Sequence, residues 1–152
     1  MSEHKAAIAW RRDDREFRYE TYSRDHTWRF ESGVTVAASA APAYLGNPER
    51  VDPEEAFVAA IASCHMLSFL AIAARRRLVV ESYEDAAVGH MDKNADGKLA
   101  VTRVVLHPRI AFGGGSAPSR EELAHLHHLS HEVCFIANSV RTEITVADDD
   151  AG

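Results

Sequence analysis

The segment from residue 52 to residue 77 constrains the fold most, because it has the features of one long helix with a defined start. Asp52 is a favourable N-cap, Pro53 suits the first helical position, and Glu55 stands where it can close a capping box with Asp52. Residues 56–74 contain no Lys, Arg, Asp or Glu. A helix that is apolar on every side is covered by the rest of its own chain or by a second copy. We therefore predict a central helix around which the remaining elements pack.

This helix is also long enough to cross a bilayer, and Arg75, Arg76 and Arg77 follow it directly. Three features oppose a membrane span: its high alanine content, its polar residues at positions 63–65 and 68, and the lack of a second such segment. The first residues, Met-Ser-Glu-His-Lys, are not followed by the apolar run of a secretory signal. We expect a soluble, cytoplasmic protein with no membrane partner.

Alternating or β-branched residues predict strands elsewhere in the chain. The predicted strands cover residues 6–10, 16–20, 27–30, 34–37, 78–92, 98–112 and 141–146. The loop 42–51 precedes the long helix, Asn94-Ala95-Asp96-Gly97 predicts a hairpin turn, and residues 113–116 predict a flexible connector. Ser119 and Glu122 form a second capping-box pattern, which predicts a helix to about residue 133. This order predicts an α+β fold with segregated layers, in a single domain over residues 1–152 with flexible ends at 1–4 and 147–152.

The bulk composition limits the classes of function. The chain has 152 residues, of which 46% are hydrophobic and 26% charged, as in a globular protein. Its net charge of −6 opposes non-specific nucleic-acid binding, which needs a basic face, so we expect no nucleic-acid partner. Two cysteines are too few to staple a domain of this size. In a reducing compartment such a pair more often serves catalysis or metal binding.

The two cysteines favour thiol redox chemistry. Cys64 lies in the apolar helical run and is followed by His65, whereas Cys134 comes three residues after His131. A nucleophilic cysteine reacts as the thiolate, which a nearby cation favours, and a second thiol can trap the sulfenic acid that a peroxide produces. The helix of Cys64 offers no cation within two turns, so a cation would have to come from a loop.

The spacing of these residues resembles that of the osmotically inducible protein C and organic hydroperoxide resistance (OsmC/Ohr) family. The resemblance rests on Pro53-Glu54-Glu55, on Cys64 nine residues beyond, on Cys134 seventy residues later, and on Arg24-Asp25. It implies an intertwined α+β homodimer that reduces hydrophobic organic hydroperoxides to alcohols. It also implies recycling by a dithiol or lipoyl-type reductant, with no metal and no organic cofactor.

Residue by residue, the resemblance makes Cys64 the peroxidatic cysteine and Cys134 the resolving one. Arg24 and Glu54 would orient the reactive thiolate. The chain departs from the family pattern in two places: Phe135 replaces the proline that usually follows the second cysteine, and Tyr22-Ser23 replaces a glycine pair before the arginine. The sequence therefore predicts a divergent branch of the family.

The position of Glu54 has a geometric consequence. Ten residues separate it from Cys64, which is about 15 Å along a continuous helix and too far for a carboxylate to reach that thiol. Either the helix breaks between the two residues, or the glutamate of a symmetry-related chain serves each site. We favour the second arrangement.

Other interpretations remain open at this stage. Arg18 and Arg29 compete with Arg24 for the role of the cation, and Cys134 could be an inert buried thiol. The thiols could be incidental in a module that binds a small apolar ligand. A zinc site could use Cys64, His65, His131 and Cys134, although a helix with histidines at 125, 127, 128 and 131 is more often a solvated surface.

Overall fold

The computed structural model describes residues 1–115 and 117–148. The chain forms two compact units, Met1–Ala56 and Phe57–Gly152, and each is described by itself. The prediction of a single domain stays a prediction. Ser116 of the predicted connector and residues 149–152 of the predicted flexible end lie outside the described residues.

The first unit is a three-stranded antiparallel sheet. Its order is β1 (Ala6–Ala9), β2 (His26–Phe30) and β3 (Thr35–Ala38), with Ala6 opposite Phe30 and Trp28 opposite Val36. A 3-10 turn, η1 (Pro42–Tyr44), lies in the predicted loop before the long helix.

The strand predicted at residues 16–20 is wrong. That segment is a series of turns in which the Tyr22 amide donates to the Arg18 carbonyl at 3.0 Å and the Thr21 hydroxyl to the Glu16 carbonyl at 2.7 Å. These local bonds use the backbone groups that a strand would direct to a neighbour.

The long helix is confirmed as α1 (Pro53–Arg75). Its capping box is formed in both directions: the Glu55 amide donates to Asp52 Oδ1 at 2.8 Å, and the Asp52 amide donates to Glu55 Oε2 at 3.1 Å. The helix ends two residues earlier than the sequence suggested, because Arg77 adopts a left-handed φ of 60° and the Leu78 amide donates back to the Ala73 carbonyl at 3.0 Å.

The second unit has two small sheets. The hairpin predicted at residues 94–97 is confirmed and joins β5 (Val88–Lys93) to β6 (Leu99–Leu106), while β8 (Glu143–Val146) adds to β6 in parallel. The other sheet pairs β4 (Val79–Asp85) with β7 (Pro108–Gly113). The strands predicted at 78–92 and 98–112 are therefore each divided in two.

The division has a specific cause. At the point where β6 passes into β7, the His107 amide donates to Asp85 Oδ1 at 2.7 Å instead of joining a strand ladder. Pro108 comes next and has no amide hydrogen to offer. Between β4 and β5, Ala87 packs into the core beside Ile61.

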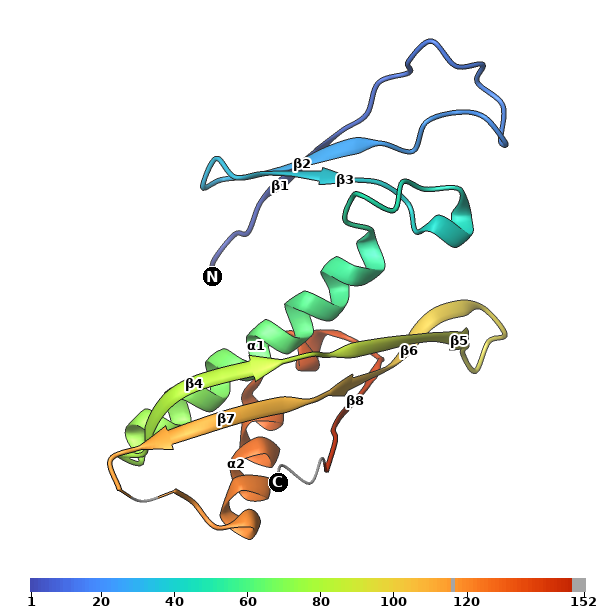
Figure 1. Ribbon diagram of the computed structural model, residues 1–152. Helices are drawn as coiled ribbons and strands as arrows, with labels where there is room; N and C mark the ends of the chain where they lie inside the picture. The colour runs from blue at the N-terminus through green and yellow to red at the C-terminus, as the bar shows by residue number, and fades with distance from the viewer. Residues whose placement is uncertain (116, 149–152) are drawn as a thin grey trace. The chain divides into compact units, whose positions relative to one another are not determined.

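The core of the second unit is built on α1. Its buried residues Ile61, His65, Phe69 and Ala73 recur every four positions along one face. Ile61 packs against Val104 and Leu106 of β6, whereas Phe69 and Ala73 pack against Leu126 of α2 (Arg120–Val133). The predicted capping box of α2 between Ser119 and Glu122 is also formed. Both helices lie on one face of the strands, which confirms an α+β fold with segregated layers (Figure 1).

By length and composition alone, α1 could cross a membrane, and it is the one helix in the described part of the chain that meets this test. Only 22% of its most apolar window is buried. A second stripe of α1 is exposed and made mostly of small residues, namely Ala60, Ser63, Leu67, Ala71 and Ala74.

Candidate thiol site

The second unit brings the two cysteines together. Cys64 is half-buried near the middle of α1, and Cys134 is 1% exposed at the C-cap of α2. Both are free thiols, and their sulfurs lie within hydrogen-bonding reach of each other. Residues seventy positions apart in sequence thus share one small site between two helices.

The surroundings of Cys134 distinguish it from Cys64. Burial raises the pKa of the Cys134 thiol, and its hydrogen bond with Cys64 raises that pKa further. The Ala137 amide opposes this change by donating to Cys134 Sγ at 3.4 Å. The net effect of these surroundings favours the protonated form of the Cys134 thiol.

The turn after α2 fixes Cys134 without the proline usual in the family. The side-chain Nδ2 of Asn138 donates to the carbonyls of Glu132 and Cys134, both at 3.0 Å. The backbone amide of Asn138 also donates to the Cys134 carbonyl at 3.0 Å. Phe135 itself is 82% exposed. Side-chain and backbone hydrogen bonds of Asn138 thus join the last turn of α2 to the turn that follows Cys134.

A buried histidine pair lies beside the cysteines. His65 Nε2 and His127 Nδ1 are 3.0 Å apart, and the two ring centroids are 5.3 Å apart with planes 12° from parallel. The pKa of each histidine is lowered to about 4, in His127 by burial and in His65 first by burial and then by the nearby His127 and His131. The pair is neutral at pH 7, so one ring donates its N–H and the other accepts it.

Arg24 belongs to the first unit and is held by its own segment. Its guanidinium lies 3.8 Å from the centre of the Tyr22 ring and 5.2 Å from that of Tyr19. It donates to the carbonyl of Tyr22 at 2.7 Å and to that of Tyr19. The competing Arg18 instead forms an exposed ion pair with Glu16.

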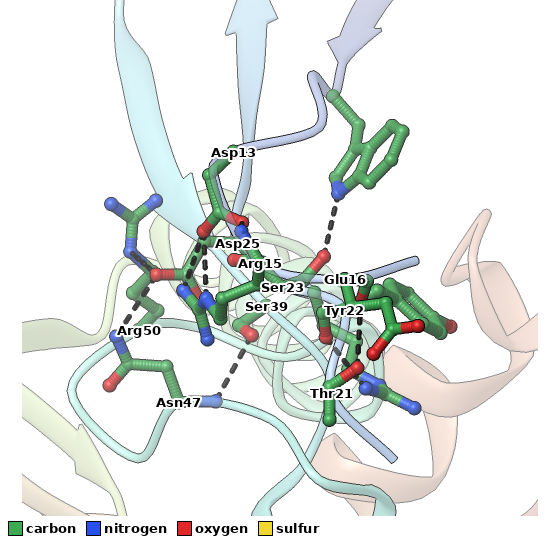
Figure 2. A network of polar contacts seen from close by, with 12 residues as sticks. Asp13, Arg15, Glu16, Thr21, Tyr22, Ser23, Asp25, Ser39, Asn47 and Arg50 are labelled. Atoms are coloured by element: carbon green, nitrogen blue, oxygen red, sulfur yellow. Dashed lines mark hydrogen bonds and ion pairs between the residues drawn. The ribbon is translucent and has the colours of Figure 1, made fainter. Parts of the chain in front are cut away.

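A network of polar contacts braces the segment around Arg24. The Asp25 carboxylate pairs with Arg50 Nε at 3.3 Å and accepts from Asn47 Nδ2 at 3.2 Å, while the Asn47 amide donates to the Ser39 hydroxyl at 3.0 Å (Figure 2). These contacts join residue 25 to the loop that precedes α1.

The first unit also contains an open cavity of about 510 Å³. Trp10, Phe17 and Tyr22 line it and contact each other, with ring centroids 5.2–6.4 Å apart. Arg24 and His26 supply its polar edge. Its size and aromatic lining suit a small apolar molecule with one polar group.

Glu54 lies in the first turn of α1, where a carboxylate is favourable to the helix dipole. The helix has no break between Glu54 and Cys64, which removes one of the two arrangements considered above. A glutamate supplied by a second chain stays a prediction.

The zinc alternative finds no support in the geometry. Within residues 1–115 and 117–148, no three His, Cys, Asp or Glu side chains are placed to hold one metal ion. His131 is exposed, as are His125 and His128, so most of the histidine-rich helix is a solvated surface as predicted. His127 is the exception, and the sequence analysis did not single out its contact with His65.

Comparisons with known proteins place this thiol-bearing α+β chain in a family. Residues 46–147 match the OsmC-like protein family. The solved structure of an OsmC-like protein of unknown function from Vibrio cholerae is 52% identical, covers 97% of this chain and 99% of its own, and superimposes with a TM-score of 0.91. No protein with a curated description matches the sequence.

More distant structures share the fold. An organic hydroperoxide resistance protein OsmC from Legionella pneumophila is 18% identical, covers 97% of this chain and 98% of its own, and has a TM-score of 0.70. The organic hydroperoxide resistance protein OhrB of Bacillus subtilis is 16% identical, covers 95% and 96%, and has a TM-score of 0.66. The chain belongs to the OsmC-like protein family.

Proposed function

We propose that this protein is a thiol peroxidase that reduces hydrophobic organic hydroperoxides to alcohols in the cytoplasm. The observation that carries the proposal is the approach of Cys64 to Cys134 within one unit. A half-buried thiol can react with a hydroperoxide, and a fully buried thiol in contact with it can trap the sulfenic acid that forms.

In the first step the Cys64 thiolate attacks one oxygen of the hydroperoxide. An S–O bond forms, the O–O bond breaks, and the alcohol leaves after its oxygen takes up a proton, so Cys64 becomes a sulfenic acid. In the second step the Cys134 sulfur attacks the Cys64 sulfur. Hydroxide leaves and combines with the proton of Cys134 to give water, and a disulfide remains.

An external dithiol, such as a lipoyl group, completes the cycle. Its two thiols reduce the Cys64–Cys134 disulfide by exchange and are themselves oxidised to a disulfide. The cycle needs no metal and no organic cofactor.

Arg24 and Glu54 orient the thiolate in this proposal, and the glutamate comes from the second chain of a homodimer. Two observations support a dimer. Among the described residues of the first unit only Ala38 is a buried apolar residue, while Ile8, Phe17 and Tyr19 are each more than 60% exposed. The exposed stripe of α1 is the second, because small residues allow two helices to pack closely.

The cavity of the first unit favours a second candidate function, the binding of a small apolar ligand without catalysis. In the peroxidase, apolar side chains near the reactive thiol would hold the alkyl group of the substrate, with roughly 0.8 kcal/mol gained for each buried methylene. The two functions differ in whether the thiols react.

One experiment separates them: intact mass after one equivalent of cumene hydroperoxide, together with dithiol-dependent consumption of the peroxide. The peroxidase loses two hydrogens in wild type, gains one oxygen in Cys134→Ser, and is inactive in Cys64→Ser. Unchanged mass in wild type, with the hydroperoxide intact, would leave the binding function.

A further inference from the structure

The histidine pair lies within the contact between the two helices that carry the cysteines. Along α1, contacts with α2 occur in the order Cys64 with Cys134, His65 with His127, and Phe69 with His127 and Leu126. Later residues of α1 thus meet earlier residues of α2, and the two helices run antiparallel.

The ring of His127 fixes how far α2 can slide along α1. It lies against His65, with centroids 5.3 Å apart, and against Phe69, with centroids 4.8 Å apart. These two residues of α1 are four positions apart and so occupy successive turns of one face. Because His127 lies against both, a shift of α2 by a turn would place it outside this contact.

The hydrogen bond between the histidines is directional and buried. His65 is 1% exposed and His127 is 8% exposed, so water cannot replace either partner if the bond is lost. His65 Nδ1 already has no hydrogen-bond partner, which makes the bond at Nε2 the one polar contact of this ring among the described residues. Loss of the bond would leave the whole ring unsatisfied in an apolar environment.

Disulfide formation depends on such placement. The two Cα atoms must lie within about 4.4–6.8 Å, with the sulfurs suitably directed. Cys64 immediately precedes His65, and Cys134 follows His127 by two helical turns. A small shift between the helices at the histidines therefore becomes a shift between the sulfurs.

We propose that His65 and His127 are positioning residues that hold Cys134 within reach of Cys64, so that the sulfenic acid is trapped as a disulfide before a second hydroperoxide reaches it. The proposal rests on the proposed function and goes beyond it. A sulfenic acid that is not trapped reacts with a second hydroperoxide, which gives a sulfinic acid and a second molecule of alcohol. The histidine pair thus determines how much peroxide the enzyme tolerates.

The chain allows a test that separates positioning from simple packing. His127 bonds through Nδ1, whose place the amide of Asn can occupy, and His65 bonds through Nε2, whose place the amide of Gln can occupy. His127→Asn and His65→Gln therefore keep a hydrogen bond but lose ring volume. His127→Leu and His65→Leu fill the space but lose the bond. His125→Leu, on an exposed position of the same helix, is the matched control.

Two readouts are needed, both well below the melting temperature of each variant. The first is the equilibrium constant for oxidation of the cysteine pair to a disulfide by oxidised dithiothreitol, which does not depend on peroxidase activity. The second is the cumene hydroperoxide concentration at which half of Cys64 becomes sulfinic acid, measured by intact mass. We expect His127→Leu to lower both values about tenfold, His127→Asn to stay within about threefold of wild type, and His125→Leu to match wild type.

Three outcomes overturn the proposal: His127→Leu equal to wild type, His127→Asn more damaging than His127→Leu, or His125→Leu as damaging as His127→Leu. If one His127 variant does not fold, the two His65 variants give the same comparison. If the wild-type cysteine pair forms no disulfide with oxidised dithiothreitol or with cumene hydroperoxide, the peroxidase function itself fails. A wild-type disulfide that the histidine variants leave unchanged removes only the positioning role.

Discussion

Asn138 Nδ2 donates to the Cys134 carbonyl at 3.0 Å and in this way holds the cysteine at the end of α2. The same nitrogen bonds the Glu132 carbonyl, so one amide ties the last turn of the helix to the turn that follows it. This arrangement explains how Phe135 can occupy a place where relatives of the family usually have a proline. We therefore expect the orientation of Cys134 to depend on a side chain four residues away.

Replacement of Asn138 should therefore affect both stability and disulfide formation. Asn138→Ala removes two hydrogen bonds, and we expect a loss of about 1–2 kcal/mol in the free energy of unfolding and slower trapping of the Cys64 sulfenic acid. Denaturant unfolding and single-turnover disulfide formation measure the two effects.

Asn94→Ala is the matched control for this prediction. Its side chain accepts two backbone hydrogen bonds in the β5–β6 turn, from Asp96 and Lys98, so a similar loss of stability is expected there. Trapping should be unchanged in that variant. Equal trapping rates in the two variants would show that Asn138 has no influence on the cysteine.

The histidine pair predicts a dependence of stability on pH. Both pKa values are lowered to about 4 in the folded protein, first of all by burial, whereas a histidine in the unfolded chain titrates near 6.5. Between these values the unfolded chain binds up to two more protons than the folded one. The contribution of the pair is therefore complete above pH 6.5 and declines as the pH falls toward 4.

Denaturant unfolding at pH 7, 6 and 5 measures this effect as the slope of the free energy against pH. Each histidine contributes at most about 1.4 kcal/mol per pH unit. The double variant His65→Gln, His127→Asn carries neither titrating ring and should lose this part of the slope. A slope that is identical in the double variant and wild type would assign the pH dependence to other groups.

Gly89 and Gly113 make a matched pair for testing the packing of α1 on the strands. A Cβ at Gly89 would lie 2.5 Å from Val58 Cγ2, which belongs to a stiff, half-buried side chain of α1. The three atoms nearest to a Cβ at Gly113 all belong to the side chain of Glu81, which is exposed and can move away. We expect Gly89→Ala to cost about 1–3 kcal/mol in thermal or denaturant unfolding and Gly113→Ala less than about 0.5 kcal/mol. Equal costs would contradict the tight approach at Gly89.

Local patterns predicted the helices well, because a capping box needs only two residues three positions apart. The boxes of Asp52 with Glu55 and of Ser119 with Glu122 are both formed. The break between β6 and β7 could not be predicted in this way, because there the His107 amide donates to Asp85, a residue twenty-two positions away. Residues 16–20 carry a strand-like pattern but satisfy their polar groups within a turn.

The candidate site, like the fold, was predictable from the sequence only in part. The resemblance to the family selected Cys64 and Cys134, and the structure places them in contact. His127 differs from His125 and His128 only in what packs against it, so its burial follows from the crossing of two helices that no short window of sequence contains. The roles of Arg24 and Glu54 stay predictions.

The dimer can be tested on the exposed stripe of α1. Leu67 is 60% exposed within one chain, so Leu67→Glu should leave the folding of a single chain intact while placing a charge between two packed helices. We expect monomers in sedimentation and loss of peroxidase activity, because the glutamate of the second chain would be absent. Leu99→Glu, at a leucine that is 62% exposed on β6, is the control and should remain dimeric and active. A dimeric and active Leu67→Glu would place the contact elsewhere.

Three arginines of the first unit can be compared to identify the cation that serves Cys64. Arg24 lies over the Tyr22 ring and on the edge of the aromatic cavity, whereas Arg18 is paired with Glu16 at 2.7 Å and Arg29 is exposed on β2. We expect Arg24→Ala to lower kcat/KM for cumene hydroperoxide by at least about 100-fold, as when one group that stabilises developing charge is removed. Arg18→Ala and Arg29→Ala should stay within about twofold of wild type.

Arg24→Lys tests what the guanidinium contributes beyond its charge. A lysine keeps the positive charge, but it lacks the planar fork that stacks on Tyr22 while it donates to the Tyr22 and Tyr19 carbonyls. An activity between those of wild type and Arg24→Ala would show that charge and geometry both matter. If Arg18→Ala or Arg29→Ala falls as far as Arg24→Ala, the cation has been assigned to the wrong residue. The aromatic stacking of Arg24 would then serve only to order its own turn.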